Sequence, residues 1–180
     1  MSDVSYAALL AFMPILLTSI GNNIRSQLEI YITILIQTIM GVPGSLLSAY
    51  LSKSKIGKKW TIFLGFFLCG LSVLLFLASS QYWMVLVSTC CINFFNQMGY
   101  SSFIAFTAES YPVELRALAV GWANAWCKFG GVLSPISIGF IFGIEGGIFY
   151  GVFLISFCFC LVGVIALFFK ENKLLYRELD

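Results

Sequence analysis

Residues 109–116 read Glu-Ser-Tyr-Pro-Val-Glu-Leu-Arg, and they decide how this chain is divided. They place three ionisable groups and a proline between two long apolar runs, in a chain where charged residues make up only 10%. Pro112 has no N–H and disfavours helical geometry at Tyr111, so one run must end here and a new one begin after Arg116. The stretch therefore predicts a turn at a membrane face, between two helices.

Composition excludes a soluble globular protein. Of the 180 residues, 60% are hydrophobic and 18 are phenylalanine, and the mean hydropathy is +0.97. A spanning helix needs about 20 apolar residues, and these runs are continuous, without the alternation of barrel strands. We therefore expect an all-α membrane protein with six transmembrane helices. The expected spans are about 6–21, 30–51, 60–79, 83–108, 117–142 and 148–169, followed by a polar tail at 170–180.

Two spans combine small residues with proline. The second span reads Gly-Val-Pro-Gly at 41–44, and the fifth contains Gly130, Gly131 and Pro135. Small residues let another helix approach closely, and proline bends a helix. We expect close helix contacts in both spans and a bend at Pro43.

Basic residues are concentrated in alternate links. One set of links, together with the tail, carries eight of them: Lys53, Lys55, Lys58, Lys59, Arg116, Lys170, Lys173 and Arg177. The opposite links carry only Arg25. Because basic residues accumulate on the cytoplasmic side of membrane proteins, we expect both termini to be cytoplasmic.

The chain offers nothing that an enzyme or a metal site needs. It has no histidine, and its six cysteines all fall inside apolar runs without a C-x-x-C spacing. Such cysteines behave as small apolar residues. We expect no enzymatic activity, no metal, no cofactor and no nucleic-acid partner.

Four polar residues of the fourth span share one helical face. Asn93, Asn96, Gln97 and Tyr100 follow the i, i+3, i+4, i+7 spacing near the middle of the bilayer. Lipid cannot satisfy amide groups, so this face must contact protein or a water-filled cavity. One interpretation is a solute site, and the other is hydrogen bonding between helices. We favour the solute site, because four polar groups on one stripe exceed what packing usually needs.

Lys128 is a charged residue within the fifth span. It lies twelve residues after Arg116, which at 1.5 Å per residue is about 18 Å into the membrane. A snorkelling side chain does not reach that far, so the ammonium must face a cavity, a carboxylate or an anionic ligand. Either its partner belongs to an absent first half, or Lys128 is often neutral. Asn124 shares its face, whereas Gln37 in the second span suits packing and cavity roles equally.

The link at 109–116 and the following Ala117 resemble a link of the major facilitator superfamily, where the tenth and eleventh helices are joined by E-x-[YF]-P-x-x-x-R-[AG]. The match is strongest to the sugar-porter and synaptic-vesicle-2-related branches. Gly57, Lys58 and Lys59 resemble the end of a second motif of that superfamily, G-x-x-x-D-R-x-G-R-K, although Ser54 replaces its acid. A plain lysine anchor at the lipid headgroups explains these lysines equally well.

This resemblance covers essentially the whole chain and implies the C-terminal six-helix half of a twelve-helix transporter. It implies secondary active or facilitative transport of a small organic solute, sugar-like or carboxylated, by alternating access. The candidate solute-binding residues are Gln37, Asn93, Asn96, Gln97, Tyr100, Asn124 and Lys128. The candidate gating residues at the cytoplasmic face are Gly57, Lys58, Lys59, Glu109, Pro112, Glu114 and Arg116. Glu109 and Arg116 are expected to pair with each other and with Lys58 or Lys59.

A single six-helix bundle has half a cavity and nothing to rock against. The expected partners are therefore the lipid bilayer, a small-molecule solute, a proton as candidate coupling ion, and a completing polypeptide. That polypeptide is a missing N-terminal half, a second copy or a full-length relative. The alternative is a non-transporting remnant or regulatory half-subunit that associates with a full-length transporter. The family implies the plasma membrane as its location.

Overall fold

A computed structural model describes residues 6–7, 27–54, 57–78, 82–142 and 147–168. Within these ranges every regular element is helical, which confirms the all-α class. The elements are α2 (Gln27–Ile39), α3 (Gly41–Lys53), α4 (Gly57–Ala78), α5 (Tyr82–Ser110), α6 (Val113–Phe142) and α7 (Gly147–Phe168). The first expected span, 6–21, lies outside the described residues except for Tyr6 and Ala7.

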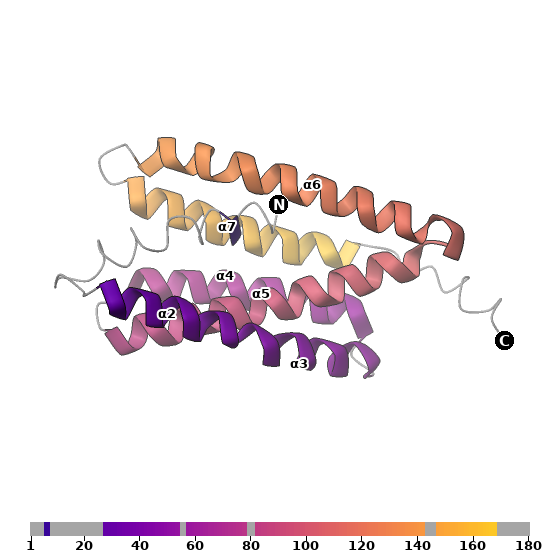
Figure 1. Ribbon diagram of the computed structural model, residues 1–180, viewed down its shortest axis with the longest axis horizontal. Coiled ribbons are helices and arrows are strands. Elements are labelled where there is room, and N and C mark those ends of the chain that lie inside the picture. The colour runs from indigo at the N-terminus through magenta and orange to yellow at the C-terminus, as the bar shows by residue number, and fades with distance from the viewer. Residues whose placement is uncertain (1–5, 8–26, 55–56, 79–81, 143–146, 169–180) are drawn as a thin grey trace.

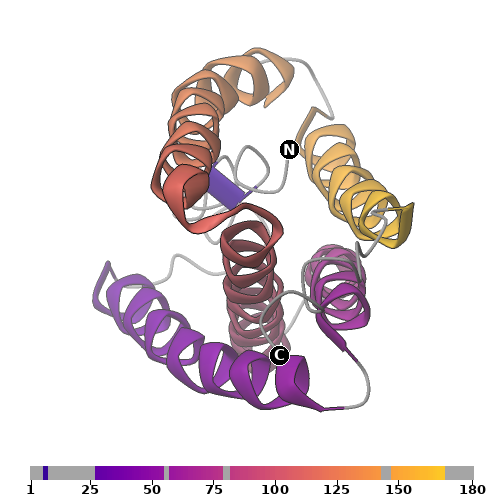
Figure 2. The same ribbon diagram turned by 90° about the vertical axis from the view of Figure 1, so that its right-hand side faces the viewer.

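The long helices run side by side as one bundle (Figure 1). Figure 2 looks along the bundle and shows α5 near its centre, with α2 and α3 below it, α4 at its right and α6 above it. α7 lies beside α4, and the short segment at Tyr6 and Ala7 lies next to α6. α5 therefore contacts α2, α3, α4 and α6, whereas α7 packs mainly against α4.

The apolar core lies between α4, α5 and α7. Its fully buried members are Ile62, Phe66, Cys69, Val73, Phe76, Val85, Ile92, Val152, Ile155, Phe159 and Ala166. The rings of Phe66 and Phe159 stack with their centroids 6.5 Å apart. α4 and α5 cross at two glycines, where a Cβ on Gly65 would lie 2.6 Å from the Cα of Gly99. This tight crossing fixes the position of α5 against α4.

The second expected span is broken between α2 and α3. α2 ends at Ile39 and α3 begins at Gly41, so the break precedes the bend expected at Pro43. The reason is that proline disturbs the turn before it, because it cannot donate to the carbonyl four residues earlier and its ring crowds that carbonyl. The carbonyl in question belongs to Ile39. Pro135 in α6 likewise leaves the carbonyl of Gly131, four residues earlier, without its helical donor. The Ser134 hydroxyl donates to this carbonyl at 3.4 Å.

The link between the fourth and fifth spans is shorter than expected. α5 continues to Ser110 and α6 begins at Val113, so only Tyr111 and Pro112 lie outside helices. The N–H groups of Leu115 and Arg116 both donate to the carbonyl of Pro112 at 3.0 Å. Pro112 therefore starts α6 as well as ending α5, and the charged residues of the link extend the helices beyond the apolar runs.

Three stretches of the described chain are long and apolar enough to cross a membrane: Tyr31–Lys53, Gly57–Phe76 and Phe149–Phe168. α5 and α6 are longer, at 29 and 30 residues, but they carry more polar side chains. Length and composition thus indicate three membrane spans within the described residues. The expected number of six transmembrane helices stays a prediction.

Candidate functional site

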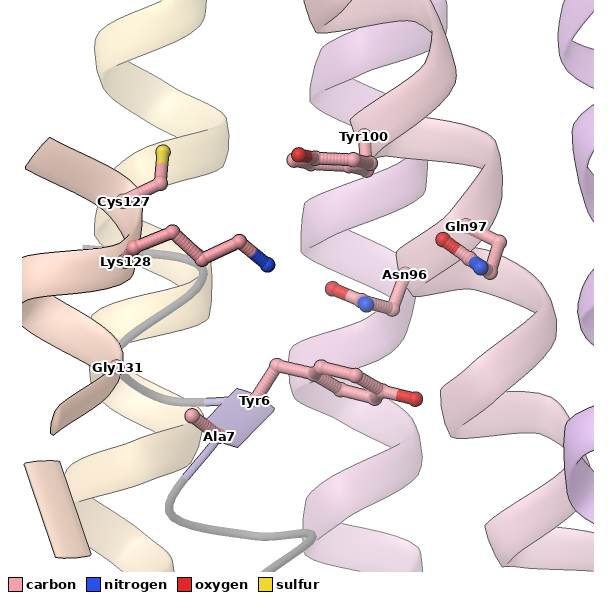
Figure 3. Close-up of a pocket in the computed structure, with 8 residues that line it drawn as sticks. All are labelled: Tyr6, Ala7, Asn96, Gln97, Tyr100, Cys127, Lys128 and Gly131. Atoms are coloured by element: carbon pink, nitrogen blue, oxygen red, sulfur yellow. The ribbon is translucent and has the colours of Figure 1, made fainter. Parts of the chain in front are cut away.

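A cavity of about 210 Å³ lies between α5, α6 and the segment at Tyr6. Its lining residues are Tyr6, Ala7, Asn96, Gln97, Tyr100, Cys127, Lys128 and Gly131 (Figure 3). The structure therefore brings together four of the residues predicted to bind solute, three from the stripe on α5 and Lys128 from α6. Polar groups from three separate segments converge on one space.

α5 supplies the uncharged polar wall of the cavity. Asn96 and Tyr100 lie one turn apart and extend toward α6, and Gln97 lies beside them (Figure 3). Asn96 is almost fully buried, with 5% of its surface exposed. An amide this buried has little contact with bulk solvent, so it suits a polar ligand or a trapped water.

Lys128 supplies the charge. Its side chain extends from α6 toward Tyr100 and Asn96, with the ammonium in the cavity (Figure 3). Among the described residues that line the cavity, Lys128 is the only one with a formal charge at neutral pH. The cavity wall is therefore electropositive and favours an anionic group.

Asn124 connects the two walls without lining the cavity itself. The Tyr100 hydroxyl donates to the Asn124 Oδ1 at 3.4 Å, a long hydrogen bond between α5 and α6. Asn124 lies one turn before Lys128 on the same helix. Its predicted place on the face of Lys128 agrees with this contact.

Asn93 and Gln37 do not line the cavity. The Asn93 Oδ1 accepts a hydrogen bond from the Tyr6 hydroxyl at 3.0 Å, and its Nδ2 donates to the backbone carbonyl of Gln37. Asn93 and Gln37 are both buried, with 5% and 4% of their surfaces exposed. The alternative interpretation of the stripe was hydrogen bonding between helices. Asn93 fits that interpretation, because its amide bonds to Tyr6 and to the backbone of α2.

Sequence reasoning missed Tyr6, Ala7, Cys127 and Gly131 as lining residues. Tyr6 is the first residue of an apolar run, and its hydroxyl is the only hint there that the segment meets something polar. Cys127 and Gly131 flank Lys128 in α6, so their exposure to the cavity follows once the face of Lys128 is known.

The candidate gating residues gather at one end of the bundle. Lys58, near the start of α4, forms an ion pair with Glu109, near the end of α5. Gly57 has a backbone φ of +76°, a left-handed conformation that favours glycine at this position. Glu114 and Arg116 are exposed at the start of α6.

The comparisons with known proteins all indicate the same family. A family model described as Major Facilitator Superfamily matches residues 1–178. The chain is 29% identical to the niacin transporter NiaP of Acinetobacter baylyi over 136 residues, which is 74% of this chain and 30% of that protein.

Two further relatives agree with this match. An uncharacterized MFS-type transporter of Schizosaccharomyces pombe is 32% identical over 128 residues, 70% of this chain and 23% of that protein. The benzoate transport protein of Acinetobacter baylyi is 24% identical over 180 residues, 98% of this chain and 37% of that protein. The chain thus spans less than half the length of each of these relatives.

Proposed function

Because this chain belongs to the major facilitator superfamily, we propose that it forms one six-helix half of a secondary transporter for a small carboxylated solute. Its membership and its apolar helices make it an integral membrane protein. The relatives are named as transporters, which speaks for transport and against an enzyme.

The observation that carries the proposal is the Lys128 ammonium in a cavity whose other polar wall groups are uncharged. A charge inside a membrane is costly unless it is paired or hydrated. A carboxylate on the solute would pair with it through a charge-assisted hydrogen bond. The Tyr6 and Tyr100 rings and the Asn96 amide would contact the rest of the molecule.

The names of two relatives support this solute class. One is named for niacin and the other for benzoate, and both compounds are carboxylates on a six-membered aromatic ring. A sugar-like solute would be neutral and would offer no charge to pair with Lys128. We therefore choose the carboxylated class over the sugar-like one.

The mechanism that we propose is alternating access. Six spans at the expected positions, with both termini cytoplasmic, would rock against a second bundle in the plasma membrane. The cavity lies between α5, α6 and the segment at Tyr6, and a completing bundle would cover its open part. A proton is the proposed coupling ion.

A regulatory half-subunit that associates with a full-length transporter is the second candidate. Such a subunit would bind a full-length transporter and change its activity without transporting solute itself.

Binding of radiolabelled nicotinate and benzoate to the purified chain tests the solute class. We expect both to bind, Lys128→Met to weaken both, and excess glucose to leave binding unchanged. Lys53→Met is the matched control, because it removes a lysine exposed at the end of α3 and should bind both compounds normally. Displacement by glucose, or full binding by Lys128→Met, would contradict the carboxylated class.

Uptake separates the two candidate functions. Vesicles that contain only this chain should accumulate labelled nicotinate if two copies complete a transporter. Uptake that appears only with an added N-terminal six-helix half identifies the chain as the other half. If neither preparation takes up nicotinate, but the chain alters uptake by a co-expressed full-length relative, the regulatory candidate is correct.

A further inference from the structure

The side-chain amide of Asn93 joins three segments of the chain. Its oxygen accepts a hydrogen bond from the Tyr6 hydroxyl at 3.0 Å, and its nitrogen donates to the carbonyl of Gln37. Asn93 itself lies in the middle of α5. Both ends of the amide therefore make a hydrogen bond within the protein.

The carbonyl of Gln37 needs this donor because α2 stops nearby. The last four carbonyls of a helix lack partners in the helix itself, and in α2 these belong to residues 36–39. The N–H of Met40 donates to the carbonyl of Ile36 at 3.1 Å, which satisfies the first of them. Lipid offers no donor to the next one, that of Gln37. Asn93 acts as a cap for α2, supplied from another helix.

The other end of the amide orients Tyr6. Tyr6 lines the cavity, and Figure 3 shows its hydroxyl turned away from Lys128, with the ring lying along the cavity. The hydrogen bond to Asn93 holds the hydroxyl in that direction. The aromatic face, rather than the hydroxyl, is therefore presented to whatever occupies the space beside Lys128.

We propose that Asn93 is a positioning residue that couples the Tyr6 wall of the cavity to the break between α2 and α3. Solute that presses on the Tyr6 ring tightens or loosens its bond to Asn93, and Asn93 in turn holds the end of α2. This inference rests on the proposed function, since it takes the cavity to be the solute site. It assigns to Asn93 no direct contact with solute.

Hydrogen exchange of backbone amides at residues 38–44, measured on the full chain with and without nicotinate, tests this coupling. Asn93→Leu removes both bonds, so without ligand it should speed exchange there about three- to tenfold. Tyr6→Phe removes only the bond to Tyr6, so it should leave this exchange near the wild-type rate. In the wild-type protein nicotinate should change the exchange at 38–44, and in Tyr6→Phe this response should be lost.

Asn96→Leu is the matched control, because Asn96 is equally buried on the same helix but lines the cavity. It should weaken nicotinate binding and leave ligand-free exchange at 38–44 unchanged. If Asn93→Leu does not fold, the loss of the nicotinate response in Tyr6→Phe carries the test. Unchanged exchange in Asn93→Leu, or a full response in Tyr6→Phe, would overturn the inference.

Failure of the proposed function gives a different result. If the wild-type protein binds no nicotinate, the proposed solute class is wrong. The proposed coupling between solute and the break after α2 is then wrong as well. The ligand-free exchange of Asn93→Leu still decides whether Asn93 caps α2. If nicotinate binds normally but never changes exchange at 38–44, the solute class stands and the coupling is wrong.

Discussion

Lys58 on α4 and Glu109 on α5 form an ion pair at the end of the bundle where α5 turns into α6. Their side chains are 20% and 52% exposed, so the pair is partly open to solvent. It joins two helices that cross tightly at Gly65 and Gly99 further along. The pair thus fixes the spacing of α4 and α5 at one end, next to the link that begins α6.

Glu109→Gln should therefore have a small effect on stability and a larger one on access to the cavity. Exposed ion pairs contribute about 0–1 kcal/mol, so the free energy of unfolding should fall by no more than that. If the pair keeps this end closed, the Cys127 thiol in the cavity should be alkylated faster from the cytoplasmic side. Mass spectrometry of the alkylated chain identifies the site.

Glu114→Gln is the control for this experiment. It removes a carboxylate from the start of α6 and leaves the ion pair of Lys58 with Glu109 intact. We expect wild-type alkylation of Cys127 in this variant. Equal rates for Glu109→Gln, Glu114→Gln and the wild-type protein would mean that the ion pair has no part in gating.

Gly65→Ala should destabilise the bundle. A Cβ at Gly65 would lie 2.6 Å from both the Cα and the N of Gly99, and these backbone atoms cannot move aside cheaply. Overpacking of this kind costs about 1–3 kcal/mol. Thermal unfolding in detergent, or unfolding by a denaturing detergent, measures the loss.

Gly121→Ala is the matched variant, because a Cβ at Gly121 in α6 meets nothing within 4 Å. Alanine is the better helix former by about 1 kcal/mol, so this variant should be as stable as the wild-type protein or more so. Similar losses at Gly65 and Gly121 would show that the α4–α5 crossing is looser than its geometry indicates.

Local patterns in the sequence predicted most helix positions, and proline effects explain the main differences. Pro112 divided α5 from α6 as expected, because its missing N–H cannot continue the preceding helix, whereas Pro135 lies inside α6. The bend expected at Pro43 lies at Met40 instead, because proline disturbs the preceding turn. The charged residues at 109–116 marked the link between α5 and α6, but the helices continue beyond the ends of the apolar runs.

The candidate site was less predictable, because it depends on neighbours in space. Helical periodicity put Asn93 and Asn96 on one face, yet only Asn96 lines the cavity. Asn93 lies where the end of α2 and the Tyr6 hydroxyl approach α5, and no local pattern on α5 records that approach. The position of Lys128 was easier to predict, because a charged side chain in an apolar run must face a cavity or a partner rather than lipid.

Cysteine labelling tests the proposed orientation. α3 ends at Lys53 and α5 begins at Tyr82, with α4 between them, so Lys53 and Trp83 lie toward opposite ends of α4. The excess of basic residues predicts that the Lys53 end is cytoplasmic. A membrane-impermeant maleimide should label Trp83→Cys in intact cells and Lys53→Cys only after permeabilisation, with sites assigned by mass spectrometry. The reverse pattern would invert the topology.

Nicotinate and nicotinamide differ mainly in charge, so comparing their affinities isolates the role of Lys128. Hydrogen bonds to charged groups are worth about 1.5–3 kcal/mol, which predicts at least about tenfold tighter binding of nicotinate by the wild-type chain. Lys128→Met should reduce the affinity for nicotinate and leave that for nicotinamide nearly unchanged, so that the ratio approaches one. Lys53→Met should keep the wild-type ratio, because Lys53 lies outside the cavity lining. If isothermal titration found the wild-type ratio in Lys128→Met, the carboxylate would be recognised by some other group, and Lys128 would have no part in selecting the solute.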